Sequence, residues 1–300
     1  MQMSNQSTKM KNAFEKFKEK LFGLKAAKIG RVIGFIVALI LAVSFCLPFL
    51  YMLLCSLQPT SASIFEQPPN IIPEVFRFRN YVDAFETMNF WRSLGNTMLL
   101  VVSVMGLNLF GSILVAYGFA RFNAKLKDTL FTILLSTMML PWVITMIPSF
   151  ALYRYINWIG TRLPLIIPAI GGSAFNIFLL RQFILGLPKN LDEAATIDGC
   201  GSFRILFEIL LPNMKPALAT LIVFSFNNVW GDYVGPSIYL LDSSLHTLSL
   251  SLYNFQDASG TMEWNKVMAG CVMYAVPMII VLFSAQDAFV RGVVTSGIKE

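Results

Sequence analysis

The chain has 300 residues, of which 56% are hydrophobic and 13% are charged, and its formal net charge at pH 7 is +6. Soluble domains carry about 25% charged residues, so this composition excludes an ordinary water-soluble protein and indicates an integral membrane protein. The 4 cysteines show no spacing typical of a metal site or a disulfide framework. The phosphate-binding pattern Gly-x-x-x-x-Gly-Lys-Ser/Thr is absent, so we expect neither an ATP site nor enzymatic chemistry in this chain.

Residues 1–31 form a basic segment that precedes the first long hydrophobic run. Within it, Phe14, Phe17, Leu21 and Leu24 fall on one stripe of a helix, with lysines on the opposite face. One interpretation is an amphipathic helix that lies on anionic membrane lipid, where basic side chains strengthen binding. The other is a floppy basic tail that only sets the orientation of the spans. The pattern does not decide between them.

Six hydrophobic runs follow, each of roughly 20 residues and therefore long enough to cross about 30 Å of hydrocarbon. Backbone groups in lipid must be hydrogen-bonded within their own segment, so these runs predict α-helices. The expected fold is an all-α integral membrane protein with one transmembrane domain over residues 32–287. The six expected spans are residues 32–57, 94–116, 129–150, 164–185, 217–236 and 267–287.

The distribution of lysine and arginine predicts the orientation of the spans. Basic residues gather in the segments that cytoplasmic loops would occupy, and few remain on the other side. Those few are Arg77, Arg79, Arg92, Arg154, Arg162 and Lys266. We therefore expect both termini, the tail of residues 288–300 and the loop of residues 188–215 to face the cytoplasm.

The loop of residues 188–215 begins with signals for a short helix. Asn190 is a candidate N-cap, and Glu193 follows three residues later as in a capping box. Asp192 lies with Glu193 in the first turn, where negative charge favours the helix N-terminus. Gly199 then predicts the end of the helix.

A second short helix is expected directly after the first. Ser202 is its candidate N-cap, and Pro212 its predicted end, while Pro216 suits the first turn of the next span. Its apolar residues recur at positions i, i+3, i+4 and i+7, which predicts one apolar face. These residues are Phe203, Leu206, Phe207 and Leu210. Two capped helices in one loop indicate a docking element for a cytoplasmic partner rather than a plain connection.

This loop resembles the cytoplasmic coupling loop of ABC importer permeases, whose pattern is Glu-Ala-Ala-x-x-x-Gly-x9-Ile-x-Leu-Pro. The matching residues, with an aspartate before the glycine, are Glu193, Ala194, Ala195, Asp198, Gly199, Ile209, Leu211 and Pro212. In that family the loop contacts a separate ATPase. The resemblance therefore implies that this segment couples ATP hydrolysis to movement of the spans.

Other stretches resemble the maltose-type carbohydrate permeases. Pro141 and Pro148 lie in the third run, like the paired prolines of those permeases. Residues 226–236, FNNVWGDYVGP, are similar to an element of their fifth span, although Gly231 stands where asparagine is usual. Residues 286–299, QDAFVRGVVTSGIK, resemble their C-terminal tail.

The resemblance implies one permease half of an ATP-driven importer in the bacterial cytoplasmic membrane. It implies a second permease subunit, expected to form a heterodimer with this one, and two cytoplasmic ATP-binding subunits that hold ATP and Mg. It also implies an extracytoplasmic binding protein that delivers a sugar or oligosaccharide. We expect no cofactor in this chain and no nucleic-acid partner.

Polar and aromatic residues near the end of the fifth run are candidates for the solute path. They are Asn227, Asn228, Trp230, Asp232 and Tyr233. Amide and carboxylate groups suit sugar hydroxyls, and aromatic rings suit stacking on sugar rings. The alternative is that the asparagines bond across helices and the aromatic residues form the interfacial belt.

Other functions also fit six hydrophobic runs. An ABC permease could instead carry polyamines, phosphate or amino acids, although the tail and the paired prolines favour sugar. An ATP-independent secondary transporter would be expected to show buried charge pairs or inverted repeats, whereas these runs are nearly free of charge. A membrane scaffold would not explain the two-helix loop.

Overall fold

Helices dominate the part of the chain that the computed structural model describes, which is residues 30–59, 72–73, 75–253, 255 and 262–297, with side chains as far as residue 284. The predictions made for residues 1–29 lie outside the described residues. The first helix is Gly30–Ser56. The α-helices that follow are α2 (Arg79–Thr87), α3 (Phe90–Arg121), α4 (Lys127–Thr137), α5 (Trp142–Tyr155), α6 (Leu163–Ile166), α7 (Ala174–Gly186), α8 (Asn190–Ile197), α9 (Ser202–Arg204), α10 (Leu211–Asn213), α11 (Lys215–Trp230), α12 (Val234–Tyr239), α13 (Leu248–Ser251) and α14 (Trp264–Gly297). The shorter elements are the 3-10 helices η1 (Ile167–Gly171) and η3 (Ser243–Leu245) and the π-helix η2 (Ile205–Leu210).

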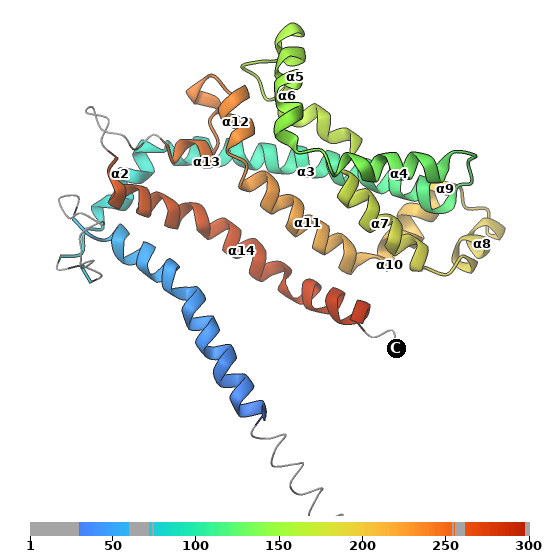
Figure 1. Cartoon of the computed structure of the whole chain (residues 1–300), viewed down its shortest axis with the longest axis horizontal. Coiled ribbons are helices and arrows are strands. Elements are labelled where there is room, and N and C mark those ends of the chain that lie inside the picture. The colour runs from blue at the N-terminus through green and yellow to red at the C-terminus, as the bar shows by residue number, and fades with distance from the viewer. Residues whose placement is uncertain (1–29, 60–71, 74, 254, 256–261, 298–300) are drawn as a thin grey trace, which may run out of the picture.

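The long helix α3 runs the length of the body of the molecule (Figure 1). It packs along α7, η1 and α11, and α11 in turn packs along α14. Helices α2 and α13 lie at one end of this body, and α8, α9 and α10 lie at the other (Figure 1). We call these the α2 end and the α8 end.

The fold matches the prediction of an all-α membrane protein. Four helical segments are individually long and apolar enough to cross a membrane, and the number rises to 6 if each of two bent helix pairs is one span. The four are Gly30–Ser56, Phe90–Arg121, Leu163–Gly186 and Trp264–Ser284. They correspond to the first, second, fourth and sixth predicted runs.

The third predicted span is broken, which the prediction of one helix over residues 129–150 did not include. Helices α4 and α5 meet at an angle of 95°. Pro141 lies at the break with extended backbone, φ −60° and ψ 130°. Proline disfavours helical backbone in the residue before it. Pro141 therefore keeps Leu140 out of a regular helix, so α4 cannot continue straight into α5. Pro148, in contrast, lies inside α5.

The fifth predicted span ends too late, and the helix that contains the sixth span is longer than the span. Helix α11 stops at Trp230 rather than continuing to residue 236, and α12 starts separately at Val234. Helix α14 continues to Gly297, through most of the segment predicted as a tail. An apolar run does not distinguish one helix from two that meet at an angle, so composition alone could not locate these ends.

A close contact between α3 and η1 holds the second and fourth spans together. A Cβ atom added to Gly111 would overlap the carbonyl oxygen of Ile170 and lie 3.0 Å from the backbone nitrogen of Gly172. Beside it, the Ser112 hydroxyl accepts a hydrogen bond of 3.2 Å from the backbone N–H of Ser173. The missing side chain at position 111 therefore permits the two backbones to touch.

We expect Gly111→Ala to destabilise the protein by about 2 kcal/mol, because the added methyl group must push the two backbones apart. Gly106→Ala is the matched control, since it lies in the same helix and a Cβ there would meet nothing within 4 Å. That change should be neutral or slightly stabilising, because alanine favours helix more than glycine does. Denaturation in detergent measures both free energies of unfolding, and equal values would contradict the proposed contact.

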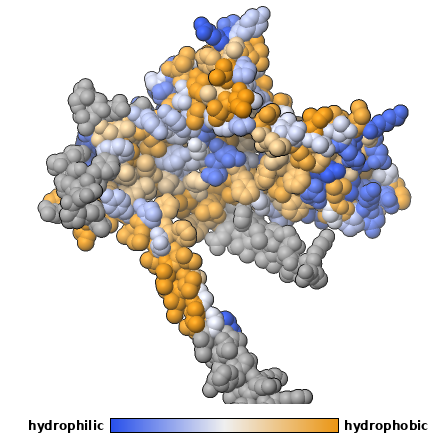
Figure 2. All heavy atoms as spheres, viewed as in Figure 1, coloured by the Kyte–Doolittle hydropathy of each residue, from blue (hydrophilic) through white to orange (hydrophobic). Residues whose placement is uncertain are grey.

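Among the residues that the structure describes, the first helix is attached to the body near its C-terminal end. The side-chain amide of Asn80 donates hydrogen bonds to the carbonyl oxygens of Ser56 at 2.9 Å and Gln58 at 2.7 Å. Residues 30–50 are all exposed, and the helix leads away from the rest of the molecule with a hydrophobic surface along its length (Figures 1 and 2). This exposed surface must face lipid or another subunit.

Two clusters of buried side chains hold the body together. One lies toward the α8 end and includes Leu180, Leu206 and Leu221. The other lies toward the α2 end and includes Trp230 and Leu248. Residues of α3 and α11 belong to both clusters, so these two helices connect the ends of the molecule mechanically.

Candidate functional site

The loop that resembles a coupling element forms the α8 end of the molecule. Helix α7 stops at Gly186, the backbone of Leu187 is extended, and α8 starts at Asn190. The predicted pair of short helices is therefore present, with α9, η2 and α10 forming the second one.

The predicted helix caps were partly wrong. The N-cap of α8 is Lys189, one residue before Asn190, and it makes no side-chain capping bond. Ser202 is likewise the first residue of α9 rather than its cap, which is Gly201. The predicted stop at Gly199 is confirmed, because α8 ends at Ile197 and Gly199 has a left-handed backbone with φ +80°.

An ion pair fixes α8 to the end of α3. The guanidinium Nη2 of Arg121 lies 2.9 Å from Oδ2 of Asp192. The same nitrogen donates a hydrogen bond of 3.1 Å to the carbonyl oxygen of Leu187. The Arg121 side chain is 8% exposed and that of Asp192 is 20% exposed, so the pair is shielded from solvent. Sequence analysis missed this contact, because the two residues are far apart in the chain.

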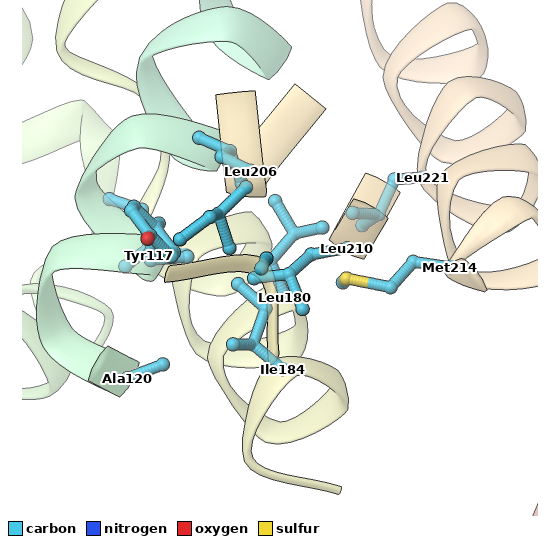
Figure 3. Close-up of a cluster of buried hydrophobic side chains, with 12 residues drawn as sticks. Tyr117, Ala120, Leu180, Ile184, Leu206, Leu210, Met214 and Leu221 are labelled. Carbon is cyan, nitrogen blue, oxygen red and sulfur yellow. The ribbon is translucent and has the colours of Figure 1, made fainter. Parts of the chain in front are cut away.

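The second short helix presents its apolar residues in two directions rather than on the single face predicted. Leu206 and Leu210 are fully buried, whereas Phe203 is 70% exposed and Phe207 is 41% exposed. Residues 205–210 form a π-helix, whose wider turn changes which residues share a face. Figure 3 shows Leu206 beside Tyr117 of α3, and Leu210 beside Leu180.

The two alanines of α8 lie in different surroundings. Ala195 is only 4% exposed and packs in the buried cluster with Leu206 and residues of α3. Ala194 is exposed, and the neighbouring Ile197 is 87% exposed. Ala195 therefore packs α8 against the rest of the molecule, while the opposite face of α8 is exposed.

The remaining residues of the predicted coupling pattern are placed as follows. Glu193, Asp198 and Gly199 are exposed with Ala194. Ile209 and Leu211 pack partly against the buried cluster. Pro212 lies in the first turn of α10 and does not end the helix as predicted. We call Glu193, Ala194, Ile197, Asp198 and Gly199 the open face of α8.

The second short helix carries one local ion pair. Arg204 donates a hydrogen bond of 2.7 Å to Oε2 of Glu208, and both side chains are more than half exposed. This contact raises the pKa of Arg204 above its ordinary value. The guanidinium therefore stays charged at any pH that the protein meets.

The predicted solute-path residues near the end of α11 do not form one site. Trp230 is fully buried, stacked on Phe226 with ring centroids 5.4 Å apart, and its carbonyl oxygen accepts a hydrogen bond of 2.7 Å from Tyr274. Asn227 and Asn228 are exposed. The indole ring therefore belongs to the core of the α2 end in this conformation.

Asp232 and Tyr233 lie in the turn between α11 and α12. Oδ1 of Asp232 accepts a hydrogen bond of 3.0 Å from the backbone N–H of Gly235. Asp232 also lines a cavity of about 340 Å³ together with Tyr153 of α5. The ring of Tyr233 stacks on Tyr253 with centroids 4.3 Å apart. This cavity is separate from the surroundings of Asn228.

Asn228 lines a groove of about 460 Å³ between α3, α7 and α11. Asn176 donates a hydrogen bond of 2.8 Å to Oδ1 of Asn108, and its amide lies 3.4 Å from the Ser225 hydroxyl. Phe175 and Phe224 also line the groove. Figure 2 shows a hydrophilic patch where α11 approaches α3, within a largely hydrophobic face.

Sequence analysis did not select Asn108 or Asn176. An asparagine within an apolar span is the available signal, because an unsatisfied amide is costly in lipid and usually faces a cavity or another helix. Their convergence with Ser225 could not be predicted without the helix packing.

Comparison with known proteins agrees with this geometry. Residues 108–295 match the family described as binding-protein-dependent transport system inner membrane component. This match includes α8, the groove helix α11 and most of α14.

Two permeases illustrate the range of relatives. The chain is 31% identical over 255 residues to the arabinooligosaccharides transport system permease protein AraQ of Halalkalibacterium halodurans, covering 84% of this chain and 90% of the relative. It is 30% identical over 267 residues to the sn-glycerol-3-phosphate transport system permease protein UgpE of Yersinia pestis, covering 87% of this chain and 95% of the relative.

A solved structure shows the same fold. A chain from a bacterial ABC transporter involved in the import of the acidic polysaccharide alginate aligns with a TM-score of 0.73 at 24% identity, covering 86% of this chain and 97% of that chain. With the family match and the relatives at 30% identity or more, the chain belongs to the inner membrane components of binding-protein-dependent transport systems.

Proposed function

We propose that this chain is one permease half of an ATP-driven importer in the bacterial cytoplasmic membrane and that it forms part of the path for a sugar or oligosaccharide. The open face of α8 is the observation that carries the proposal. It is exposed, it lies at one end of the molecule, and the Arg121–Asp192 ion pair holds it on α3. A partner that moves α8 therefore moves a helix that spans the molecule.

The partner at the open face is an ATP-binding subunit, of which the assembled importer has two, each holding ATP and Mg. The α8 end and both termini face the cytoplasm in this proposal, in keeping with the distribution of lysine and arginine. Closure of the ATPase pair would shift α8, and through α3 and α7 it would switch the spans between inward-facing and outward-facing states.

A second permease subunit, different from this one, would complete the path. The exposed first helix supports this part of the proposal, because its residues 30–50 find no cover within the described part of the chain. The loops at the α2 end would receive an extracytoplasmic binding protein loaded with solute. Binding of that protein at the α2 end and binding of ATP at the α8 end would then both shift the equilibrium between the inward-facing and outward-facing states of the spans.

Sugar is the favoured cargo because two relatives are named for sugars. These are the arabinooligosaccharide permease already described and a probable starch degradation products permease of Thermoanaerobacterium thermosulfurigenes, 31% identical over 255 residues. Import of a phosphorylated polyol is the second candidate, since the Yersinia pestis relative is named for sn-glycerol-3-phosphate.

Co-purification from native membranes tests the proposal. The tagged full chain, extracted in detergent, should bring down a second permease and a protein that contains the Gly-x-x-x-x-Gly-Lys-Ser/Thr loop, and the sample should hydrolyse ATP. Recovery of the intact chain without an ATPase and without ATP hydrolysis would overturn the proposal and favour a self-sufficient carrier.

A further inference from the structure

We infer that the groove between α3, α7 and α11 is a solute-contact site of this permease half and that it selects an uncharged, polyhydroxylated solute. The inference rests on the proposed function and deepens it. The groove has a volume of about 460 Å³, which is within the usual range for sites that hold small ligands. No residue was assigned to a solute from the sequence in α3 or α7.

The polar groups of the groove suit hydroxyl groups. Asn108, Asn176 and Asn228 each offer both a hydrogen-bond donor and an acceptor, as a hydroxyl group does, and Ser225 adds a hydroxyl. Within the described part of the chain, the side-chain amide of Asn228 makes no hydrogen bond. An amide without a hydrogen bond on an apolar helix can accept and donate to a polar group that binds beside it, and a solute hydroxyl can supply that group.

The aromatic residues of the groove suit the apolar face of a sugar ring. Phe175 and Phe224 meet edge to face, with centroids 6.2 Å apart and an interplanar angle of 72°. Phe175 is 43% exposed, so it presents apolar surface to the groove. Apolar rings beside a few placed polar groups are the usual composition of a site for a small organic ligand.

The charge of the lining decides between the two candidate cargoes. None of the described residues that line the groove is ionisable. An anionic solute would therefore give up hydration on binding without gaining a basic partner from this half, and that loss is costly. The groove fits a neutral oligosaccharide and not a phosphorylated polyol or a uronic acid polymer.

The test uses the full complex, reconstituted in proteoliposomes with its partner subunits and binding protein. The probes are neutral trisaccharides of arabinose and glucose and a uronic acid trisaccharide of the same length. Both ATP hydrolysis and solute uptake are measured for wild type and for Asn228→Ala. Asn227→Ala is the matched comparison, since Asn227 is the adjacent exposed asparagine but does not line the groove.

Wild type should import a neutral trisaccharide at least about tenfold faster than the charged one. Asn228→Ala should lower uptake per ATP hydrolysed by about fivefold, which corresponds to the loss of one hydrogen bond, while Asn227→Ala should change it less than about twofold.

Unchanged uptake per ATP hydrolysed in Asn228→Ala, or faster uptake of the uronic acid trisaccharide, would overturn the inference while leaving the proposed importer function intact. Loss of the second permease from Asn228→Ala complexes would also overturn it, because the groove would then be a subunit interface. If no ATPase is present and ATP hydrolysis is absent, the proposed function itself fails.

Discussion

The variant Gly199→Asp should remain in the membrane and lose its ATPase partner. Its left-handed backbone, φ +80°, makes any side chain cost about 1 kcal/mol, but a Cβ atom there meets nothing within 4 Å, so the fold is retained. The new carboxylate projects beside the open face of α8. The ATP-binding subunit would bury this carboxylate without a partner, which costs more than about 1.4 kcal/mol of binding free energy. Recovery of the ATPase should therefore fall by about tenfold or more.

A matched control separates backbone strain from the position of the charge. Gly160 also has a left-handed backbone, φ +82°, and open space around its Cβ, but it lies in the loop between α5 and α6. Gly160→Asp should therefore keep the ATPase at the wild-type level. Quantitative immunoblotting of purified complexes measures both variants. Normal ATPase recovery with Gly199→Asp, or equal losses in both variants, would contradict the assignment of α8.

The variant Arg121→Met should destabilise the α8 end by about 3 kcal/mol, because it leaves the carboxylate of Asp192 shielded and unpaired. Adding Asp192→Ala should recover part of that loss, since a pair replaced by apolar groups is much less costly than a broken pair. Denaturation in detergent gives the free energies of unfolding for the double-mutant cycle. If the two single effects simply add, the ion pair does not hold α8 to α3.

Arg204→Met provides the control for this cycle. It removes an arginine from a pair of similar distance, but Arg204 and Glu208 are 63% and 61% exposed. Exposed pairs contribute little to stability, so this variant should unfold like wild type. Arg121→Met should in addition lower uptake per ATP hydrolysed, because α3 would follow α8 less closely. Wild-type coupling in Arg121→Met would show that the force passes through α7 instead.

The hydrophobic runs were sufficient to predict the fold class because their length and composition are constrained by the membrane itself. The two short helices of residues 188–215 could be predicted because their signals are local, and Gly199 takes the left-handed backbone that a helix-ending glycine suits. Its exact caps could not be predicted, since Asn190 and Ser202 are capable of capping but the chain enters each helix one residue earlier.

The features that remained unpredicted depend on packing between distant segments. The π-helix at residues 205–210 turns Leu206 and Leu210 inward and leaves Phe203 exposed, which an α-helical periodicity does not reproduce. Trp230 stood beside polar residues in the sequence, yet packing buries it completely. The groove at Asn228 required three helices to converge, and no single stretch of sequence contains that information.

The most direct test of the central claim is site-specific cross-linking in intact membranes. A photoreactive amino acid at Ile197, which is 87% exposed on the open face of α8, should cross-link to the ATP-binding subunit, and the yield should change when ATP is added. The same amino acid at Tyr155, which is 85% exposed at the end of α5, should give no such product. Cross-linking of the ATPase from Tyr155 and not from Ile197 would contradict the account of α8 as the coupling element.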